Sequence, residues 1–273
     1  MIDTPTQPQA RVDHRAIKAR RAGFIRDIIS LGGRALRSIP RDPESIIPAL
    51  VVPLFFFAVN VGALQDVAEQ LPGLDYKAFQ LPVAILFAVT GVTRANILVM
   101  DIQGGYFDRL ALTPVNRLAM LLGFMVADLV LVMALSVPVI ILGLIVGVRF
   151  ESGALGVLAF LAIAGIWALA YNAIPYAVAL KTGNPAAVNS SFLLFLPVTF
   201  LTTVFVPQDA LTGWMAQVVK FNPVTYLLQG MRSLITEGWV ASDLLAAFAG
   251  IGAVALLSVP LAMWALMGRV RRR

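Results

Sequence analysis

The side chains that usually carry catalysis or hold metal ions are scarce in this sequence. Cysteine is absent, which excludes thiol catalysis, disulfides and cysteine-ligated metals. His14 is the one histidine and lies in a polar stretch, so neither a histidine dyad nor a histidine-based metal centre is available. No Gly-x-x-x-x-Gly-Lys-Ser/Thr loop is present to cradle the phosphates of ATP. We therefore expect a protein that is not an enzyme and has no metal or cofactor site of its own.

The composition is that of a membrane protein. Hydrophobic residues make up 59% and charged residues 13% of the 273 residues, against roughly 45–50% and about 25% in soluble domains. One soluble core cannot bury this excess, whereas a bilayer accommodates runs of about 20 apolar residues. The apolar stretches long enough to cross are residues 46–64, 81–100, 118–148, 154–180, 187–206 and 244–267. We predict an all-α integral membrane protein with six transmembrane helices.

The distribution of Lys and Arg predicts the orientation, because short positively charged segments are retained in the cytoplasm. Six spans place both termini on one side of the membrane. If that side is the cytoplasm, all but four of the 21 Lys and Arg residues are cytoplasmic, the exceptions being Lys77, Arg149, Lys220 and Arg232. The polar opening stretch lacks the pattern of a cleaved signal peptide. We predict a multi-pass protein of the plasma or inner membrane with both termini in the cytoplasm.

The chain divides into a polar N-terminal region, residues 1–41, and a six-span domain, residues 42–273. Within the first region, one apolar stripe recurs at helical spacing over Ile17, Phe24, Ile28, Leu31, Ala35 and Ile39. The basic residues Arg15, Arg26, Arg34 and Arg37 lie opposite this stripe. We predict an interfacial helix with its stripe among acyl chains and its cations at lipid phosphates. A solvated basic helix is the alternative. Nucleic-acid binding is not expected, because no aromatic residues interleave the basic ones.

A compact cytoplasmic segment is predicted between the second and third spans. Gly104 and Gly105 end the second span, a short amphipathic helix follows, and Thr113-Pro114 ends it. An apolar face of Phe107, Leu110 and Ala111 beside the charges of Asp108, Arg109 and Arg117 predicts docking into a groove of a soluble partner. The alternative is a simple turn covered by its own side chains.

Residues 208–242 are too polar to cross the membrane and too rich in large apolar residues to lie free in water. These apolar residues are Trp214, Val218, Phe221, Tyr226, Leu227, Met231 and Trp239. Short re-entrant helices in the outer leaflet, with Trp and Tyr at the headgroups, satisfy both requirements. An extracellular loop with surface aromatic residues is the alternative.

A few polar side chains lie inside the predicted spans. Asp128 is the one acid well inside, and two roles are open for it: a structural bond to a neighbouring helix, or a part in coupling or permeation. The remaining polar residues are Asn60, Asn172, Asn189, Thr199, Thr202 and Thr203. These residues either line a translocation path or form hydrogen bonds between helices.

Two of these segments resemble those of type-2 ABC exporter permeases, particularly the daunorubicin-resistance-like branch. The first resembles the coupling helix of that family through Gly105, Asp108-Arg109-Leu110 and Thr113-Pro114-Val115-Asn116-Arg117. Gln103 departs from the pattern, because many relatives have an acidic residue there. The second resembles the exit of the family's fifth span and its outer helices, through Pro207, Trp214, Asn222-Pro223-Val224-Thr225-Tyr226 and Arg232. With the six-span plan, the resemblance covers most of the chain.

The resemblance implies a permease subunit that moves a hydrophobic or amphipathic substrate outward, such as a drug, a lipid, or a glycolipid or polysaccharide. ATP and Mg²⁺ are then bound by a separate cytoplasmic ATPase, and the permease is expected to form a homodimer embedded among membrane lipids. Two other classes of function are considered. One is an ion-coupled carrier, for which the spans have few of the expected acids and cations. The other is a membrane-embedded enzyme acting on lipid-linked substrates.

Overall fold

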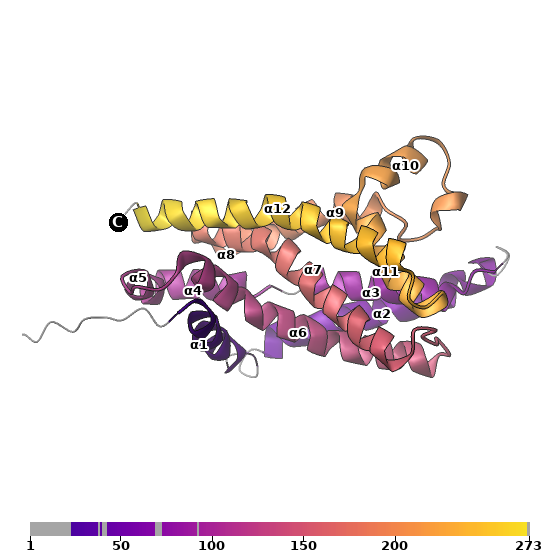
Figure 1. Cartoon of the computed structure of the whole chain (residues 1–273), viewed down its shortest axis with the longest axis horizontal. Helices are drawn as coiled ribbons and strands as arrows, with labels where there is room; N and C mark the ends of the chain where they lie inside the picture. Colours follow the sequence, from indigo (N-terminus) through magenta and orange to yellow (C-terminus); the bar gives the residue numbers. More distant parts are fainter. Residues whose placement is uncertain (1–22, 38, 40–42, 69–72, 92, 272–273) are drawn as a thin grey trace, which may run out of the picture.

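The computed structural model describes residues 23–37, 39, 43–68, 73–91 and 93–271, and within these ranges the chain is helical without any strand. In chain order its helices are α1 (Phe24–Arg37), α2 (Pro43–Ala68), α3 (Tyr76–Gly91), α4 (Ala95–Gln103), α5 (Tyr106–Ala111), α6 (Arg117–Ile145), α7 (Gly153–Thr182), α8 (Pro185–Ser190), α9 (Phe192–Phe200), η2 (Gln208–Ala210), α10 (Gly213–Val218), η3 (Val219–Phe221), α11 (Pro223–Thr236) and α12 (Ala241–Arg271). The long helices run roughly side by side (Figure 1). α1, α5 and the end of α12 lie toward one end of this bundle, and α10 and α11 lie toward the other.

Four of the described helices are long and apolar enough to cross a membrane. They comprise residues Ile46–Asp66 of α2 and the whole of α6, α7 and α12. Each coincides with a stretch for which the sequence predicts a span, because a continuous apolar run satisfies its backbone within a single helix. The chain is therefore an all-helical integral membrane protein.

The other two predicted spans are divided into shorter helices. Residues 81–100 are shared between α3 and α4, which are separated by a break before Ala95. Residues 187–206 comprise α8, α9 and a series of bends that begins at Leu201. Pro197 lies inside α9, where it removes one backbone donor and shortens the helix. Of the six predicted spans, four are therefore single helices and two are interrupted, because local apolarity does not reveal where a helix is interrupted.

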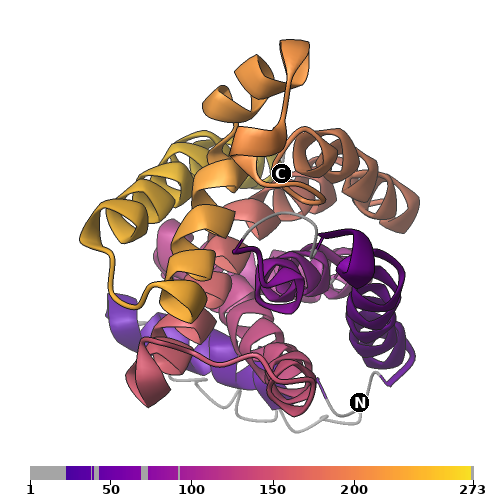
Figure 2. The ribbon, with the colours of Figure 1, turned by 90° about the vertical axis from the view of Figure 1, so that its right-hand side faces the viewer.

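Close packing around α7 and α12 holds the bundle together. α7 contacts α3, α4, α6, α11 and α12, and its Trp167 is among the largest fully buried side chains. Glycines let neighbouring helices approach closely: a Cβ at Gly165 of α7 would lie 3.2 Å from Met133 of α6. At Gly250 of α12 a Cβ would lie 2.7 Å from the Pro223 carbonyl oxygen of α11. Viewed along the long helices, α10 and its neighbours protrude from this bundle (Figure 2).

We predict that the contact between α11 and α12 depends on Gly250. Gly250→Ala should lower the free energy of unfolding by about 1–3 kcal/mol, because the new Cβ meets a backbone carbonyl that cannot rotate away. Gly252→Ala on the same helix is the matched control, because no atom lies within 4 Å of its Cβ position. The control should be neutral or should stabilise by up to about 1 kcal/mol through its helix propensity. Thermal unfolding in detergent measures both, and equal shifts would contradict the packing argument.

Candidate functional site

The segment predicted to dock on a partner forms a compact knob, defined here as residues 104–117. Gly105 has a left-handed backbone (φ 73°), a conformation that glycine adopts readily, and leads directly into α5. Asn116 ends the knob by capping α6, since its side chain accepts hydrogen bonds from the amides of Leu118 and Ala119 at 2.9 and 3.3 Å. The Arg117 guanidinium donates to the Ala111 carbonyl at 3.1 Å. These contacts make the knob a fixed structure.

Phe107 points into the molecule and anchors the knob. Its side chain is 1% exposed and packs near Phe124, with ring centroids 6.5 Å apart. Leu110 and Ala111 are partly buried against the same cluster. The prediction that Phe107 offers an exposed apolar face is therefore wrong. Phe107, Leu110 and Ala111 share one helical face, and that face covers the ends of the longer helices.

The exposed surface of the knob is formed by other residues. Leu112 is 88% exposed, and Arg109, Thr113 and Pro114 are exposed beside it. Leu112 was not among the residues predicted to dock, although its position in the helix indicated that it points away from Phe107. Five residues after Phe107, it lies about 140° around a helix from that inward-facing ring. An apolar side chain presented to water at this point is available to a partner.

An ion pair joins α1 to the end of α4, just before the knob. The Arg34 guanidinium donates two parallel hydrogen bonds to the Asp101 carboxylate, both 2.8 Å long. The same guanidinium lies 3.8 Å from the centroid of the Tyr106 ring, a cation–π contact. The hydrogen-bonded Asp101 carboxylate raises the pKa of Arg34 above its ordinary value, so Arg34 remains charged. Asp101, at the end of α4, was not singled out from the sequence, because its partner is 67 residues away.

α1 packs on α6 through its apolar stripe. A Cβ at Gly123 of α6 would lie 2.7 Å from Leu31, and a Cβ at Gly32 of α1 would lie 3.0 Å from Val126. Ile28 and Ala35 are half-buried, whereas Phe24, Ile25 and Ile29 are exposed. The stripe expected among acyl chains therefore faces protein over most of its length. The exposed apolar surface of α1 is instead formed mainly by Ile25 and Ile29. Ile17 of the predicted stripe, and Arg15 opposite it, lie outside the described residues.

Further contacts tie the end of α4 and the knob to α7 and α12. Gln103 donates to the Gly183 carbonyl at 3.0 Å, at the end of α7. Arg269 of α12 donates to the Leu180 carbonyl at 3.0 Å, and its guanidinium lies 5.9 Å from the centroid of the Phe107 ring. The knob is thus connected to α1, α4, α6, α7 and α12 at one end of the bundle.

Asp128 is fully buried at the point where α3 and α4 separate. One carboxylate oxygen accepts a hydrogen bond from the Arg94 backbone amide at 3.0 Å, and the other accepts one from the Asn172 side chain at 3.1 Å. The Tyr176 hydroxyl donates to the Phe124 carbonyl nearby, at 3.0 Å. The sequence left two roles open for Asp128, and the structure contains the bond between helices, which joins α6 to α7. Its part in coupling stays a prediction.

The residues predicted to line a path do not form one group. Asn189 accepts a hydrogen bond from Asn96 at 2.8 Å and lines a cavity of about 410 Å³ bordered by α2, α7 and α9. Asn60 bonds to the Phe56 carbonyl of its own helix. Thr199 and Thr202 are buried, and Thr203 lines a separate cavity toward the far end of the molecule. The break that follows α9 separates Thr202 and Thr203 from Asn189, whereas a continuous helix would have held them in one span.

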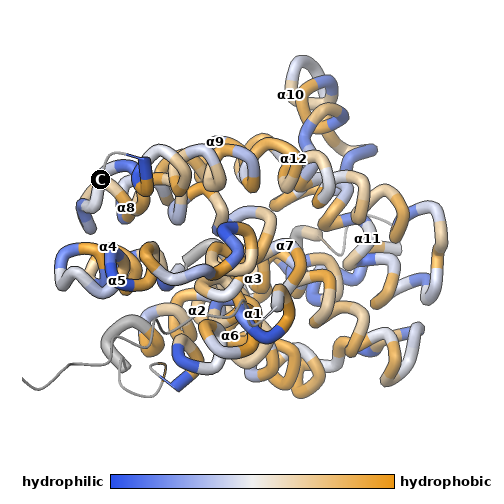
Figure 3. The backbone as a smooth tube through the Cα atoms, turned by 60° about the vertical axis from the view of Figure 1, so that its left-hand side comes forward, coloured by the Kyte–Doolittle hydropathy of each residue, from blue (hydrophilic) through white to orange (hydrophobic). Residues whose placement is uncertain are grey.

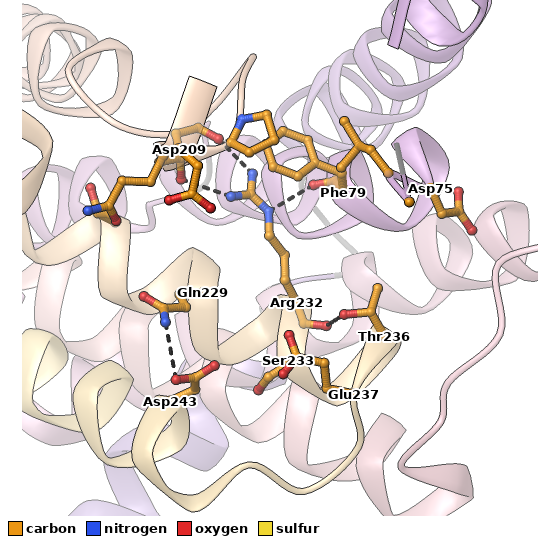
Figure 4. Close-up of a pocket in the computed structure, with 15 residues that line it drawn as sticks. Asp75, Phe79, Asp209, Gln229, Arg232, Ser233, Thr236, Glu237 and Asp243 are labelled. Atoms are coloured by element: carbon orange, nitrogen blue, oxygen red, sulfur yellow. Dashed lines mark hydrogen bonds between the residues drawn. The ribbon is translucent and has the colours of Figure 1, made fainter. Parts of the chain in front are cut away.

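Arg232 holds the outer helices against the bundle. Its guanidinium donates to the Phe79 carbonyl at 3.1 Å, and to the Thr203 hydroxyl and carbonyl at 2.8 and 2.7 Å. The guanidinium carbon lies 3.5 Å from the centroid of the Phe79 ring. Burial lowers the pKa of Arg232 to about 9, so it remains a cation at neutral pH. One side chain of α11 therefore joins α3 to the bend that follows α9 (Figure 4).

Other residues of the outer region have mainly structural contacts. Asn222 caps α11, with Pro223 at its first turn, by accepting from the Val224 amide at 3.0 Å. The Tyr226 hydroxyl donates to the Lys220 carbonyl, and Trp214 is 70% exposed. Arg232 also borders a cavity of about 540 Å³, whose wall carries the carboxylates of Asp75, Asp209, Glu237 and Asp243. No metal-binding group of three or more His, Cys, Asp or Glu side chains occurs among the residues that the structure describes.

Comparison with known proteins identifies the family of this chain. Residues 26–236 match the family described as ABC-2 type transporter. The chain belongs to this family. Its matched region begins in α1 and ends at the last residue of α11, so it contains the knob and the outer helices together. The chain is the transmembrane subunit of an ABC transporter, in which the ATPase is a separate partner.

Individual relatives place it in the drug-resistance branch of ABC-2 permeases. It is 28% identical over 231 residues to a daunorubicin resistance ABC transporter permease of Streptomyces coeruleorubidus, covering 81% of this chain and 80% of the relative. It is 28% identical over 245 residues to a probable doxorubicin resistance ABC transporter permease of Mycobacterium tuberculosis, covering 88% of each. A putative transport permease of Cyanophora paradoxa is 25% identical over 230 residues, or 81% and 78% of the two chains. These relatives support the permease interpretation over the carrier and enzyme alternatives.

The opposite orientations of Phe107 and Leu112 make a prediction about stability. Phe107→Ala should lower the free energy of unfolding by about 3–5 kcal/mol, because it leaves a cavity in a packed cluster. Leu112→Ala should change it by less than about 0.5 kcal/mol, because this side chain is exposed. Thermal or denaturant unfolding of the purified permease measures the pair. Equal losses in the two variants would show that the knob is not anchored through Phe107.

Proposed function

We propose that this permease exports a hydrophobic or amphipathic, drug-like molecule as a homodimer paired with two copies of a cytoplasmic ATPase. ATP and Mg²⁺ are bound by the ATPase, and the permease provides the route through the membrane. The observation that carries the proposal is the knob, which presents exposed Leu112, Arg109 and Pro114 while Phe107 holds it in the bundle. An exposed apolar residue flanked by charge on a rigid support suits a groove on a soluble protein.

The contacts around the knob support a direct mechanical connection to the spans. A force on α5 acts on α1 through the contact of Tyr106 with Arg34, and on α12 through the contact of Phe107 with Arg269. The adjoining end of α4 adds the bond of Asp101 to Arg34 and that of Gln103 to the end of α7. The break beside Arg94 lets α4 move with the knob while α3 stays in place. For ATP to drive this change, the ATPase must bind one conformation of the permease several kcal/mol more tightly than the other.

Six crossings with cytoplasmic termini agree with both the positive charges and the divided helices. In this arrangement α3 with α4, and α8 with α9, each complete one crossing, and α2, α6, α7 and α12 provide the others. The knob and α1 then lie on the cytoplasmic side, and α10 and α11 form re-entrant helices at the outer side. Interrupted helices are tolerated in a bilayer where neighbouring helices satisfy the freed backbone groups.

The cavity beside α2 supports an amphipathic cargo. Its wall is mainly apolar and aromatic, with Phe87, Tyr171 and Phe192, and its polar groups include Thr93, Asn189 and Ser191. Such a wall accepts flat apolar rings together with a few hydrogen-bonding groups. The relatives named for resistance to daunorubicin and doxorubicin support the same class of cargo.

Docking through the knob predicts a selective loss of coupling. Leu112→Ala should reduce permease-stimulated ATP hydrolysis by the co-expressed ATPase about tenfold, the equivalent of 1.4 kcal/mol of lost contact. Leu155→Ala is the control, because Leu155 is 70% exposed in the first turn of α7, near Ser152, which is hydrogen-bonded to α11 and not to the knob. ATPase assays and co-purification of the complex provide the measurement. If substitutions of Leu112, Arg109 and Pro114 all leave both unchanged, the docking assignment is wrong.

The absence of cysteine allows the orientation to be tested one residue at a time. Thr113→Cys in the knob should react with an impermeant maleimide only after the cell membrane is opened. Gln208→Cys in η2, which is exposed, should react in intact cells. Labelling of Thr113→Cys from outside would contradict the proposed orientation, whatever the ATPase measurements show.

A further inference from the structure

A cavity of about 410 Å³ lies between α1 and α4, next to the Arg34–Asp101 pair. It is lined by Arg34, Ala35, Arg37, Arg94, Ile97, Leu98, Asp101, Phe124 and Tyr176. Three of these residues are arginines and one is an acid, so the cavity combines an excess of positive charge with an apolar floor. Neither the knob nor the apolar cavity beside α2 includes Arg37.

The positive charge of this cavity is only partly compensated by protein carboxylates. Asp101 is occupied by the two hydrogen bonds from Arg34, and the buried Asp128 lies close enough to interact with the charge of Arg94. Arg37 is exposed in the last turn of α1, and the one carboxylate among the lining residues, Asp101, is already bound by Arg34. One anionic group entering the cavity would therefore restore the balance. A phosphate fits best, because the planar guanidinium donates to two of its oxygens at once.

The position of α1 places this cavity at the level of lipid headgroups. Ile25 and Ile29, one helical turn apart, are 71% and 67% exposed and form an apolar surface that faces away from the protein. α1 carries apolar and polar residues side by side where it lies on α6 (Figure 3). A helix of this kind lies at the boundary between acyl chains and headgroups. The floor of the cavity, with Ile97 and Leu98, is equally suited to the apolar part of an amphipathic ligand.

We propose that this cavity binds the phosphate of one anionic phospholipid, held by Arg37 at its mouth and Arg94 at its base, with the glycerol and first acyl carbons on Ile97 and Leu98. Basic pockets beside transmembrane helices on the cytoplasmic face are known to hold anionic headgroups. The assignment of the lipid to the cytoplasmic leaflet rests on the proposed function, whereas the binding itself does not. A lipid bound here joins α1 to α4 beside the Arg34–Asp101 pair, and so stabilises the support of the knob.

The experiment uses the purified full-length permease in non-ionic detergent without any ATPase, so it is independent of transport. Thermal unfolding is followed while short-chain phosphatidylglycerol, short-chain phosphatidylcholine or inorganic phosphate is added. Arg37→Gln should raise the half-saturating concentration of phosphatidylglycerol about tenfold, the equivalent of 1.4 kcal/mol. Arg26→Gln is the matched control, since Arg26 is exposed on the same helix but does not line the cavity.

Saturable stabilisation by phosphatidylglycerol that Arg37→Gln weakens and Arg26→Gln leaves within twofold supports the site. Equal stabilisation by phosphatidylcholine would show that charge is not recognised, and equal saturation by inorganic phosphate would assign the cavity to a free anion. Equal effects of the two arginine variants would reduce the interaction to surface charge. Each of these three outcomes overturns the proposal, and none of them affects the docking of the ATPase on Leu112.

Discussion

The structure depends on a buried carboxylate, Asp128, which binds the chain where α3 and α4 separate. Where α3 and α4 separate, backbone amides lose their partners within the helix, and Arg94 and Asp128 are both buried there. The Asp128 carboxylate accepts one hydrogen bond from the Arg94 amide and another from the Asn172 side chain. An unsatisfied buried group costs about 1–3 kcal/mol, so this contact makes the break tolerable. It also determines where α4 begins, and hence where the knob is placed.

The knob illustrates how one short helix serves two purposes. Its inner face carries Phe107 into a cluster built by α4, α6, α7 and α12, and its outer face leaves Leu112 exposed. Arg34 contributes both an ion pair and a ring contact, which are geometrically demanding because the guanidinium is planar. A segment fixed in this way is held rigidly to its supports, which the proposed coupling role requires.

The break within residues 187–206 is likewise satisfied by side chains of the outer helices. α9 ends at Phe200, and the carbonyls of Val198 and Leu201 accept hydrogen bonds from the Asn222 side chain at 2.6 and 2.9 Å. Arg232 joins the next bend to α3 through Thr203 and Phe79. α3 is therefore held beside Asp128 at one end and by Arg232 at the other. Both interruptions are satisfied by side chains from distant parts of the chain, as an apolar surrounding requires.

The sequence alone determined the class of the protein and the position of its main parts. Apolar runs long enough to cross predict α2, α6, α7 and α12, because a continuous run satisfies its own backbone within one helix. The glycines and the Thr113-Pro114 pair indicate the ends of the knob, since these residues restrict the backbone locally. The resemblance of the knob and outer segments to ABC-2 permeases also agrees with the family that the chain belongs to.

Only the tertiary structure decided which side chains face inward and which partners they meet. Phe107 and Leu112 are both apolar, and their spacing places them on different faces of the helix without showing which face is buried; Phe107 is 1% and Leu112 is 88% exposed. The contact of Arg34 with Asp101 spans 67 residues, and that of Asp128 with Arg94 spans 34. Such pairs depend on how helices pack, and packing depends on small residues such as Gly123 that accept a neighbour's side chain. The breaks within residues 81–100 and 187–206 were hidden for the same reason, because the groups that make them tolerable come from other helices.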